Sequence, residues 1–447
     1  MSKESDYNIN ETNALDEITE PLSNYQSKNK QKIIIIVLSC IIGILVFGMV
    51  IYFCIAYKTK KSNDKDSNSN NNDNNNDEQK NTDKFKVRYN IPYFNETTNL
   101  IENTFKFGGK NYNNNYGDVN HGNDYNKSNL NYYSIVIPKS VYDNKDGYNK
   151  IFLWIHGGAW IGLNKDMMIP LCNWTAGIGY ISATVGYTLL TNNSTDHKSM
   201  YRILDEITAC LKNILQFLEK ENIKTNDIQM AIGGVSAGAH LSLLYSYFMN
   251  NPIIPIKYVL NIAGPVTINP DFYLENDRLN NTLENLEPTT IDNARKVEWF
   301  KPIKRDMINP ANLTKIMNYA IGYIYDQSII NEIIKSDGYN VDKNNQNYKD
   351  LLYKADSIIS PLNFTTKDSP PTINYYGGND DGVGVVQYSL LKKKYYEVGY
   401  SKDLMVYARN NTHADAIDLT TISGKKAFDE LVAAIYLYET KYIAKKN

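Results

Sequence analysis

The sequence predicts an α/β fold, in which a mostly parallel, doubly wound sheet is covered by helices on both faces. The first observation behind this prediction is an alternation of short apolar runs with longer amphipathic runs from Phe85 onward. The second is a glycine-rich turn, GGVSAG at 233–238, between a strand-like run and a helix-like run. Strands that alternate with helices form parallel sheets, because each helix carries the chain back across one face.

Strands are expected where short runs rich in β-branched and aromatic residues stand between turn residues. These runs cover 132–137, 151–155, 180–187, 228–232, 256–262, 372–376 and 404–408. Helices are expected where apolar residues recur at helical spacing. These segments cover 198–221, 239–249, 385–398 and 425–442.

The alternation lapses between Gly264 and Pro361, where only two helix-like pieces stand out, near 313–325 and 327–335. A stretch of this length is too long for a plain loop between two strands. We therefore expect a cap inserted at about 265–360 into one domain that spans 85–447. Local disorder in part of this stretch is the alternative.

The N-terminal part of the chain predicts a membrane anchor. After a short polar tail at 1–32, the run Ile33–Ala56 carries no charge in 24 residues. As a helix it would measure about 36 Å, enough to cross a hydrocarbon core of about 30 Å. A signal peptide would start earlier and end at a small-residue cleavage site, and a buried core helix is the other alternative. We expect a single transmembrane helix at 33–57 that contacts the lipid bilayer.

Residues 58–84 are expected to form a disordered, asparagine-rich linker, because Ser62–Asp83 contains no apolar residue. Lysines flank the span evenly, at 28, 30 and 32 before it and at 58, 60 and 61 after it. The positive-inside rule therefore gives no orientation. A first span that begins late and lacks a leader favours a cytosolic N-terminus, with the large domain on the luminal or extracellular side.

Composition excludes some classes of function. The net charge is −2 and no basic stripe is visible, so nothing indicates a nucleic-acid partner. Of the four cysteines, Cys40 and Cys54 lie in the apolar run, and Cys172 and Cys210 lie in the globular part. Two distant thiols make neither a disulfide framework nor a metal cluster, and this pair could be free or bridged.

The glycine-rich turn carries the first candidate site residue. Ser236 stands between Gly234 and Gly238, after the strand-like IQMAI and before the helix-like AHLSLLYSYFM. A strand, a sharp turn and a helix in this order are what a nucleophile elbow requires, and the glycines let the turn close. The alternative is a tight turn that simply needs small residues.

A second turn, His156-Gly157-Gly158-Ala159-Trp160, follows the strand-like IFLWI. Small residues here leave backbone amides able to point at a developing oxyanion. The amide of Ala237, directly after the serine, would add another donor. Losing one such donor typically lowers the rate by about 10² to 10³.

A serine needs a base, and the base needs an acid that fixes its tautomer. His413 follows the strand-like LMVYA and can reach the serine through a loop, whereas His240 lies on the helix and is expected to be structural. The acid is expected after TINYY, at Asp380 with Asp381 as the fallback. A plain Asp-Asp-Gly turn is the alternative for this pair.

These motifs resemble those of α/β-hydrolases of the esterase and lipase group, which includes hormone-sensitive-lipase-like and feruloyl-esterase-like carboxylesterases. The similarity covers about residues 130 to 440 and is carried by HGGAW at 156–160, GVSAGAHL at 234–241, GGNDDGV at 377–383 and THA at 412–414. The resemblance implies an α/β-hydrolase fold. It also implies a catalytic triad and an oxyanion hole, formed by Ser236, Asp380 and His413 and by the amides of Gly158, Ala159 and Ala237.

Two positions depart from the family pattern. Ala159 replaces the third glycine of the HGGG form, which needs only its N–H. Gly384 stands where many relatives have proline after the acid loop, which bears on the choice between Asp380 and Asp381.

The expected function is that of a membrane-anchored serine esterase. It would cleave a small-molecule or lipid ester through an acyl-enzyme, with no metal or organic cofactor. Kynurenine formamidases and prenylcysteine methylesterases carry similar HGG-x-W and GxSAGAH stretches, so a formamidase or other amidase is one alternative. A membrane-anchored binding module that kept the fold without catalysis is the other.

Overall fold

The structure of the protein is a computed structural model. It describes residues 79–81, 84–93, 106–107, 110–111, 131–144, 150–190, 199–225, 227–249, 251–270, 309–378, 380, 382–408, 411–413, 415, 417 and 422–443. The chain divides into two units, Met1–Asn75 and Asn76–Asn447. The expected tail at 1–32, the expected span at 33–57 and most of the expected linker lie outside the described residues. Within the described part, none of the helices is long and apolar enough to cross a bilayer.

The described strands of the second unit form a nine-stranded sheet and a separate two-stranded one. The order in the large sheet is β1 (Gln79–Asn81), β2 (Phe85–Pro92), β5 (Tyr132–Pro138), β7 (Ile181–Val185), β6 (Lys150–Ile155), β8 (Gln229–Val235), β9 (Ile256–Ile262), β10 (Thr372–Gly377) and β11 (Asp403–Ala408). The small sheet pairs β3 (Lys106–Phe107) with β4 (Lys110–Asn111). Neighbours from β7 through β11 pair in parallel, whereas β1, β2 and β5 pair antiparallel. The mostly parallel sheet predicted from the sequence is confirmed.

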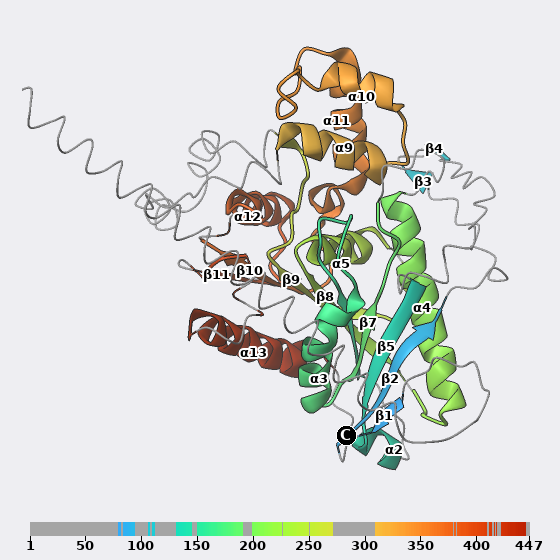
Figure 1. Ribbon diagram of the computed structural model, residues 1–447. Helices are drawn as coiled ribbons and strands as arrows, with labels where there is room; N and C mark the ends of the chain where they lie inside the picture. Colours follow the sequence, from blue (N-terminus) through green and yellow to red (C-terminus); the bar gives the residue numbers. More distant parts are fainter. Residues whose placement is uncertain are drawn as a thin grey trace, which may run out of the picture. The chain divides into compact units, whose positions relative to one another are not determined.

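Both faces of the sheet are buried, which explains why its central strands are continuously apolar. Alternate side chains of β6 point to opposite faces, as the strand period of two requires. Leu153 packs on one face with α4 (Met200–Lys220), α5 (Ala237–Phe248) and α12 (Val386–Val398). Phe152 and Trp154 pack on the other with α3 (Ile169–Gly177) and α13 (Ile422–Tyr442). Figure 1 shows α3 and α13 on one side of the sheet and α4 and α5 on the other.

All the expected strands and helices of the sheet domain are present, with ends shifted by a few residues. Further elements of the sheet domain were not expected, among them the antiparallel strands β1 and β2, the four-residue helix α2 (Ser140–Asp143) and the helix α3. Cys172 lies in α3 and Cys210 in α4, on opposite faces of the sheet, and both are buried free thiols. Burial raises the pKa of Cys172 to about 12, so this thiol stays protonated.

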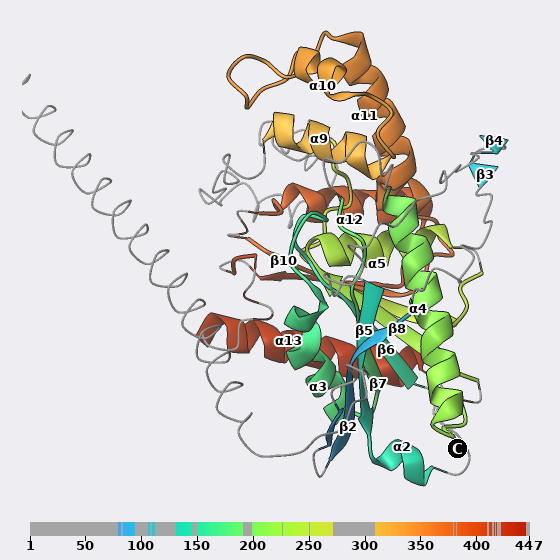
Figure 2. The ribbon, with the colours of Figure 1, turned by 45° about the vertical axis from the view of Figure 1, so that its right-hand side comes forward.

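The expected cap is described at 309–360 and contains three helices that lie together (Figures 1 and 2). They are α9 (Pro310–Ala320), α10 (Gln327–Ile333) and α11 (Gln346–Ile359), of which α11 was not expected. Side-chain oxygens of Asn309, Asp326 and Asn345 cap their first turns by accepting hydrogen bonds from backbone amides. Some of the abundant asparagine in this chain therefore starts helices.

The base of the cap is fastened to the sheet domain by two polar side chains, one buried and one partly buried. Gln387 on α12 accepts hydrogen bonds from the amides of Val266 and Thr267, at 2.8 and 3.1 Å. Asp356 on α11 accepts from the hydroxyls of Thr267 and Ser360, at 2.8 and 2.7 Å. The first and last segments of the insertion are thus tied to each other and to α12.

Candidate active site

Ser236 occupies a strained turn at the junction of β8 and α5. Its backbone angles are φ 57° and ψ −123°, which a residue with a side chain rarely adopts. Such a conformation costs about 1–3 kcal/mol and persists only where the surroundings fix it. Here the Ser236 amide donates to the carbonyl of Ile262 on β9 at 2.9 Å, and the Ser236 carbonyl accepts from the amide of His240 at 3.0 Å. The sharp turn that the Gly-x-Ser-x-Gly spacing indicates is present.

The two glycines of this turn allow backbones to approach where no side chain fits. A Cβ atom at Gly238 would lie 2.1 Å from the carbonyl oxygen of Ile155, and one at Gly234 would lie 2.4 Å from the carbonyl carbon of Gly238. The elbow is therefore pressed against the end of β6. A Cβ atom at Gly157 would lie 3.3 Å from the Ser236 Cβ, so the loop that follows β6 lies directly beside the serine.

This loop contains three consecutive residues in the left-handed region: Gly158 (φ 109°), Ala159 (φ 51°) and Trp160 (φ 63°). Two of them are not glycine, so the loop stores strain that the surroundings must offset. The amides of Ile161 and Gly162 donate to the Gly158 carbonyl, at 3.0 and 2.9 Å. The turn is closed by its own backbone, and Gly158 and Ala159 within it are partly buried.

His156 lies at the start of the same loop and stabilises it. Its ring is fully buried and stacks on Tyr187, with ring centroids 4.1 Å apart. Its Nδ1–H donates to the Gly157 carbonyl at 2.8 Å, and the Tyr187 hydroxyl donates to the His156 carbonyl at 3.0 Å. Burial lowers the pKa of His156 to about 4, so this imidazole is neutral near pH 7.

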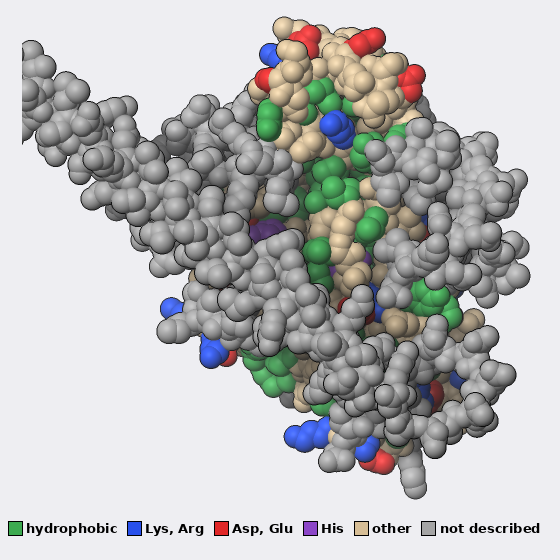
Figure 3. All heavy atoms as spheres, viewed as in Figure 1, with side chains coloured by type: hydrophobic (Ala, Val, Ile, Leu, Met, Phe, Trp, Pro, Cys, Tyr) green, Lys and Arg blue, Asp and Glu red, His purple; other side chains and the backbone are tan. Residues whose placement is uncertain are grey.

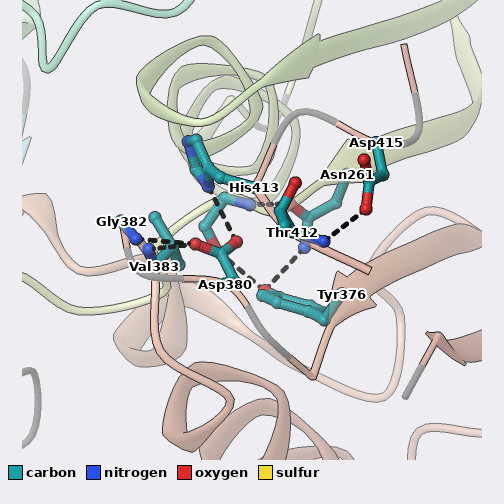
Figure 4. Close-up of polar contacts among 9 residues, drawn as sticks. Asn261, Tyr376, Asp380, Gly382, Val383, Thr412, His413 and Asp415 are labelled. Carbon is teal, nitrogen blue, oxygen red and sulfur yellow. Dashed lines mark hydrogen bonds and ion pairs between the residues drawn. The ribbon is translucent and has the colours of Figure 1, made fainter. Parts of the chain in front are cut away.

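The side chains of Asp380, after β10, and His413, after β11, point toward each other (Figure 4). His413 Nδ1 lies 2.7 Å from Asp380 Oδ2, and the Asp380 side chain is fully buried. The other carboxylate oxygen accepts from the amides of Gly382 and Val383, at 2.8 and 2.7 Å. Because a carboxylate only accepts hydrogen bonds, this contact places a proton on His413 Nδ1.

A second layer of hydrogen bonds fixes the loops around this pair. The Asp415 carboxylate accepts from the amide of Thr412 at 2.6 Å (Figure 4), which shapes the turn that presents His413. The Tyr376 hydroxyl on β10 donates to the Gly264 carbonyl at 2.7 Å and accepts from Asn261 Nδ2 at 2.9 Å. Burial raises the pKa of Tyr376, so it remains a neutral donor there.

The residues expected at the site all follow carboxyl ends of parallel strands. Ser236 follows β8, Gly158 and Ala159 follow β6, Asp380 follows β10 and His413 follows β11. Ligands of open α/β sheets bind outside this edge. The structure brings Asp380 together with His413 and the loop after β6 together with Ser236. The approach of the His413 ring to the Ser236 hydroxyl stays a prediction. Asp381 lies outside the described residues.

His240, expected to be structural, is fully buried on α5 and hydrogen-bonds through Nε2 to the carbonyl of Ile359 at 2.9 Å. Its ring meets the Trp160 ring edge to face, with centroids 5.0 Å apart. Sequence reasoning missed this pair, although the HGGAW turn contains the tryptophan and GVSAGAH contains the histidine. Within the described part of the chain, no group of three His, Cys, Asp or Glu side chains could hold a metal ion.

The sequence model of the BD-FAE family matches residues 138–395, which is more than half of the chain. No curated protein matches the chain. Among solved structures, a truncated carbohydrate esterase from gut microbiota is similar at a TM-score of 0.44 and 16% identity, over 70% of this chain and 92% of that one. An inhibited esterase B from Lactobacillus rhamnosis is similar at a TM-score of 0.44 and 13% identity, over 70% of this chain and 84% of that one. Carboxyl esterase 2 from the mycorrhizal fungus Tuber melanosporum is similar at a TM-score of 0.45 and 15% identity, over 69% of this chain and 80% of that one. The match to the family model, and not these structural likenesses, shows the family of the chain.

Proposed function

The chain belongs to the BD-FAE family of α/β-hydrolase esterases and is an ester hydrolase, and from this premise we propose that it cleaves carboxylic esters through an acyl-enzyme on Ser236. His413 is the general base and Asp380 is the acid that orients it. The observation that carries the proposal is the 2.7 Å contact between His413 Nδ1 and the buried Asp380 carboxylate. This contact leaves the lone pair of the imidazole on Nε2, where a base for the serine needs it.

Acylation begins when the Ser236 Oγ attacks the acyl carbonyl carbon and His413 Nε2 takes the hydroxyl proton. The resulting imidazolium is stabilised by the Asp380 carboxylate, which itself stays ionised. His413 then delivers the same proton to the alkoxide oxygen as the carbon–oxygen bond of the ester breaks. The alcohol leaves, and the acyl group remains bonded to Ser236.

The oxyanion of the tetrahedral intermediate is held by the amides of Gly158, Ala159 and Ala237. Ala237 is the first residue of α5, and amides in the first turn of a helix have no intrahelical acceptor. The close approach of Gly157 to Ser236 supports the assignment on the other side, because it brings the loop that carries Gly158 and Ala159 beside the serine. Water then repeats the cycle on the acyl-enzyme and releases the carboxylic acid.

Apolar side chains lie close in sequence to this loop. Ile161, Leu163 and Met167 are each at least half exposed. On the face drawn in Figure 3, hydrophobic side chains gather below the cap helices. These observations favour esters with an apolar acyl or alcohol group.

An ester is the expected substrate class, as opposed to a formamide. The wild-type enzyme is expected to hydrolyse p-nitrophenyl acetate or butyrate with a larger kcat/KM than an N-formyl anilide. Both substrates use the same nucleophile, so the ratio of the two kcat/KM values reports the acyl and leaving groups that the site accepts. A formamide that is turned over faster than the ester, in spite of its poorer leaving group, would show a formamidase instead.

We propose further that residues 33–57 anchor the enzyme in a membrane, with the catalytic domain on the luminal or extracellular side. The uncharged run Ile33–Ala56 supports this proposal. The full chain is expected to stay in the membrane pellet after extraction with alkaline carbonate. Substituting Leu45→Lys and Val46→Lys together should release it, because each charge at a helix centre costs about 2.5–3.5 kcal/mol. Release of the unaltered chain would refute the anchor. If protease added to sealed microsomes digests the catalytic domain, the domain lies on the cytosolic side and the proposed orientation is wrong.

A further inference from the structure

His240 connects three segments that are distant in the sequence. It lies on α5, one turn after Ser236. Its ring contacts the ring of Trp160 in the loop after β6, and its Nε2–H donates to the carbonyl of Ile359 at the end of α11 in the cap. Both rings are buried, with Trp160 3% exposed and His240 fully covered.

The contact between the two rings is one of packing. Neither Trp160 Nε1 nor His240 Nδ1 has a hydrogen-bond partner among the described residues. The rings meet at an interplanar angle of 82°, which is the edge-to-face arrangement favoured by aromatic pairs. The contact with Trp160 therefore requires a flat ring at position 240 and does not require the ring nitrogen atoms.

Trp160 is the last of the three left-handed residues of the loop and directly follows Ala159. The base of the loop is already fixed by the close approach of Gly157 to Ser236 and of Gly238 to Ile155. The tip at 158–160 is held by its own turn, by a hydrogen bond of 2.8 Å from the Leu190 amide to the Trp160 carbonyl, and by burial of the Trp160 side chain in the apolar core, where its ring packs on His240. The last of these ties the tip to α5.

An oxyanion hole works only when its donors lie about 2.7–3.1 Å from one point. Here one donor, Ala237, moves with α5, and the other two, Gly158 and Ala159, move with the loop. We infer that His240 is a positioning residue whose ring, by packing on Trp160, holds the two halves of the oxyanion hole in register. This inference rests on the proposed function.

The hydrogen bond of His240 to the cap has a smaller role. The base of the cap is also held by Gln387 and by Asp356, through their hydrogen bonds to the segment that begins at Val266. Burial lowers the pKa of His240 to about 3, so the ring is neutral near pH 7. No titratable or charged group is needed at this position.

Two variants separate the ring from the donor. His240→Phe keeps a flat ring against Trp160 and removes the donor to Ile359, whereas His240→Gln keeps an amide donor and removes the ring. We expect His240→Phe to keep kcat within about threefold of the wild type. His240→Gln is expected to lower kcat by about 10²-fold with little change in KM, because a shift of about 1 Å in the donors has an effect of this size.

A transition-state analogue supplies the readout that a purely structural role would not move. The Ki of an alkyl trifluoromethyl ketone, which forms an oxyanion on the serine, is expected to rise for His240→Gln in parallel with the loss of kcat/KM. Melting temperatures of both variants check folding. If His240→Gln does not fold, Trp160→Leu removes the other ring. It is expected to lower kcat with little change in KM and to raise the Ki of the ketone.

Several results would overturn the inference. Loss of kcat in His240→Phe, with His240→Gln fully active, would assign the effect to the cap hydrogen bond. Equal loss in both variants would show that a flat ring at position 240 is not sufficient to hold the loop. Wild-type kcat and Ki in both variants, with Ser236→Ala inactive, would refute the inference and leave the proposed function standing. Turnover in Ser236→Ala would instead refute the proposed function itself.

Discussion

Replacing Ser236 by alanine is expected to lower kcat for a short-chain p-nitrophenyl ester by about 10⁵- to 10⁶-fold, the size of effect that loss of the nucleophile has in serine hydrolases. Without Oγ no acyl-enzyme can form, and only the oxyanion donors and substrate binding remain. Alanine removes a single oxygen atom at the start of α5, so the fold and its melting temperature should be retained. The measurement is release of p-nitrophenolate by protein whose folding has been checked by circular dichroism.

Ser246→Ala is the matched control for this variant. Ser246 lies on the same helix, is buried, and its hydroxyl has no hydrogen-bond partner among the described residues. Removing that hydroxyl should leave kcat and KM unchanged. Substantial ester turnover by Ser236→Ala, above the level of a buffer blank, would contradict the assignment of the nucleophile.

Asp380→Asn is expected to lower kcat by about 10⁴-fold while KM changes little. The carboxylate now accepts from the amides of Gly382 and Val383 through one oxygen and from His413 through the other. In asparagine only one of these two atoms is an acceptor. If its oxygen keeps the two amides, its NH₂ group faces His413 Nδ1 and drives the imidazole proton onto Nε2, where it blocks general-base catalysis.

Asp381→Asn distinguishes the two neighbouring carboxylates. If Asp380 is the acid, the neighbouring substitution should keep most of the activity, since no role falls to Asp381 in the proposed mechanism. The reverse pattern, with an active Asp380→Asn and an inactive Asp381→Asn, would move the acid to position 381. Steady-state kinetics on both proteins, prepared in parallel, decide between these outcomes.

The regular part of the fold could be predicted because its signals are local. Strands β6 and β8 through β11 are short apolar runs bounded by turn residues, and α4 carries its apolar residues at helical spacing. The elbow was also predictable, because only glycines tolerate the contacts found at Gly234 and Gly238. Reasoning from the turns and strand ends pointed to Ser236, His413 and Asp380, and the resemblance of the HGGAW, GVSAGAH and GGNDDGV stretches to known esterases implied the same triad.

Other features depend on contacts between distant segments and leave no local pattern. The helix α3 was missed because its sequence, IPLCNWTAG, lacks an amphipathic period; in the structure it packs against β7 and shares a core cluster with α13. The strand β2 was missed because it contains lysine, arginine and asparagine and lies in the antiparallel part of the sheet, between β1 and β5. Ala159 and Trp160 are not residues for which local propensity predicts a left-handed conformation.

The partnership of His240 with Trp160 joins positions 80 residues apart, and nothing in either motif alone indicates it. The same holds for Gln387, which lies on α12 and fastens the start of the cap at Val266. Single-sequence reasoning finds residues that do chemistry, because the chemistry restricts the residue type. It misses residues that hold others in place, because many side chains could do so and the geometry selects one.

The central claim is that Ser236 is a nucleophile activated by His413, and the most direct measurement is the site and rate of labelling by a fluorophosphonate. Intact mass and peptide mapping should show one adduct, on the peptide that contains Ser236. The adduct should be absent in Ser236→Ala, and it should form far more slowly in His413→Ala and Asp380→Asn. An adduct on a different residue, or equal labelling rates in the wild type and His413→Ala, would contradict the account.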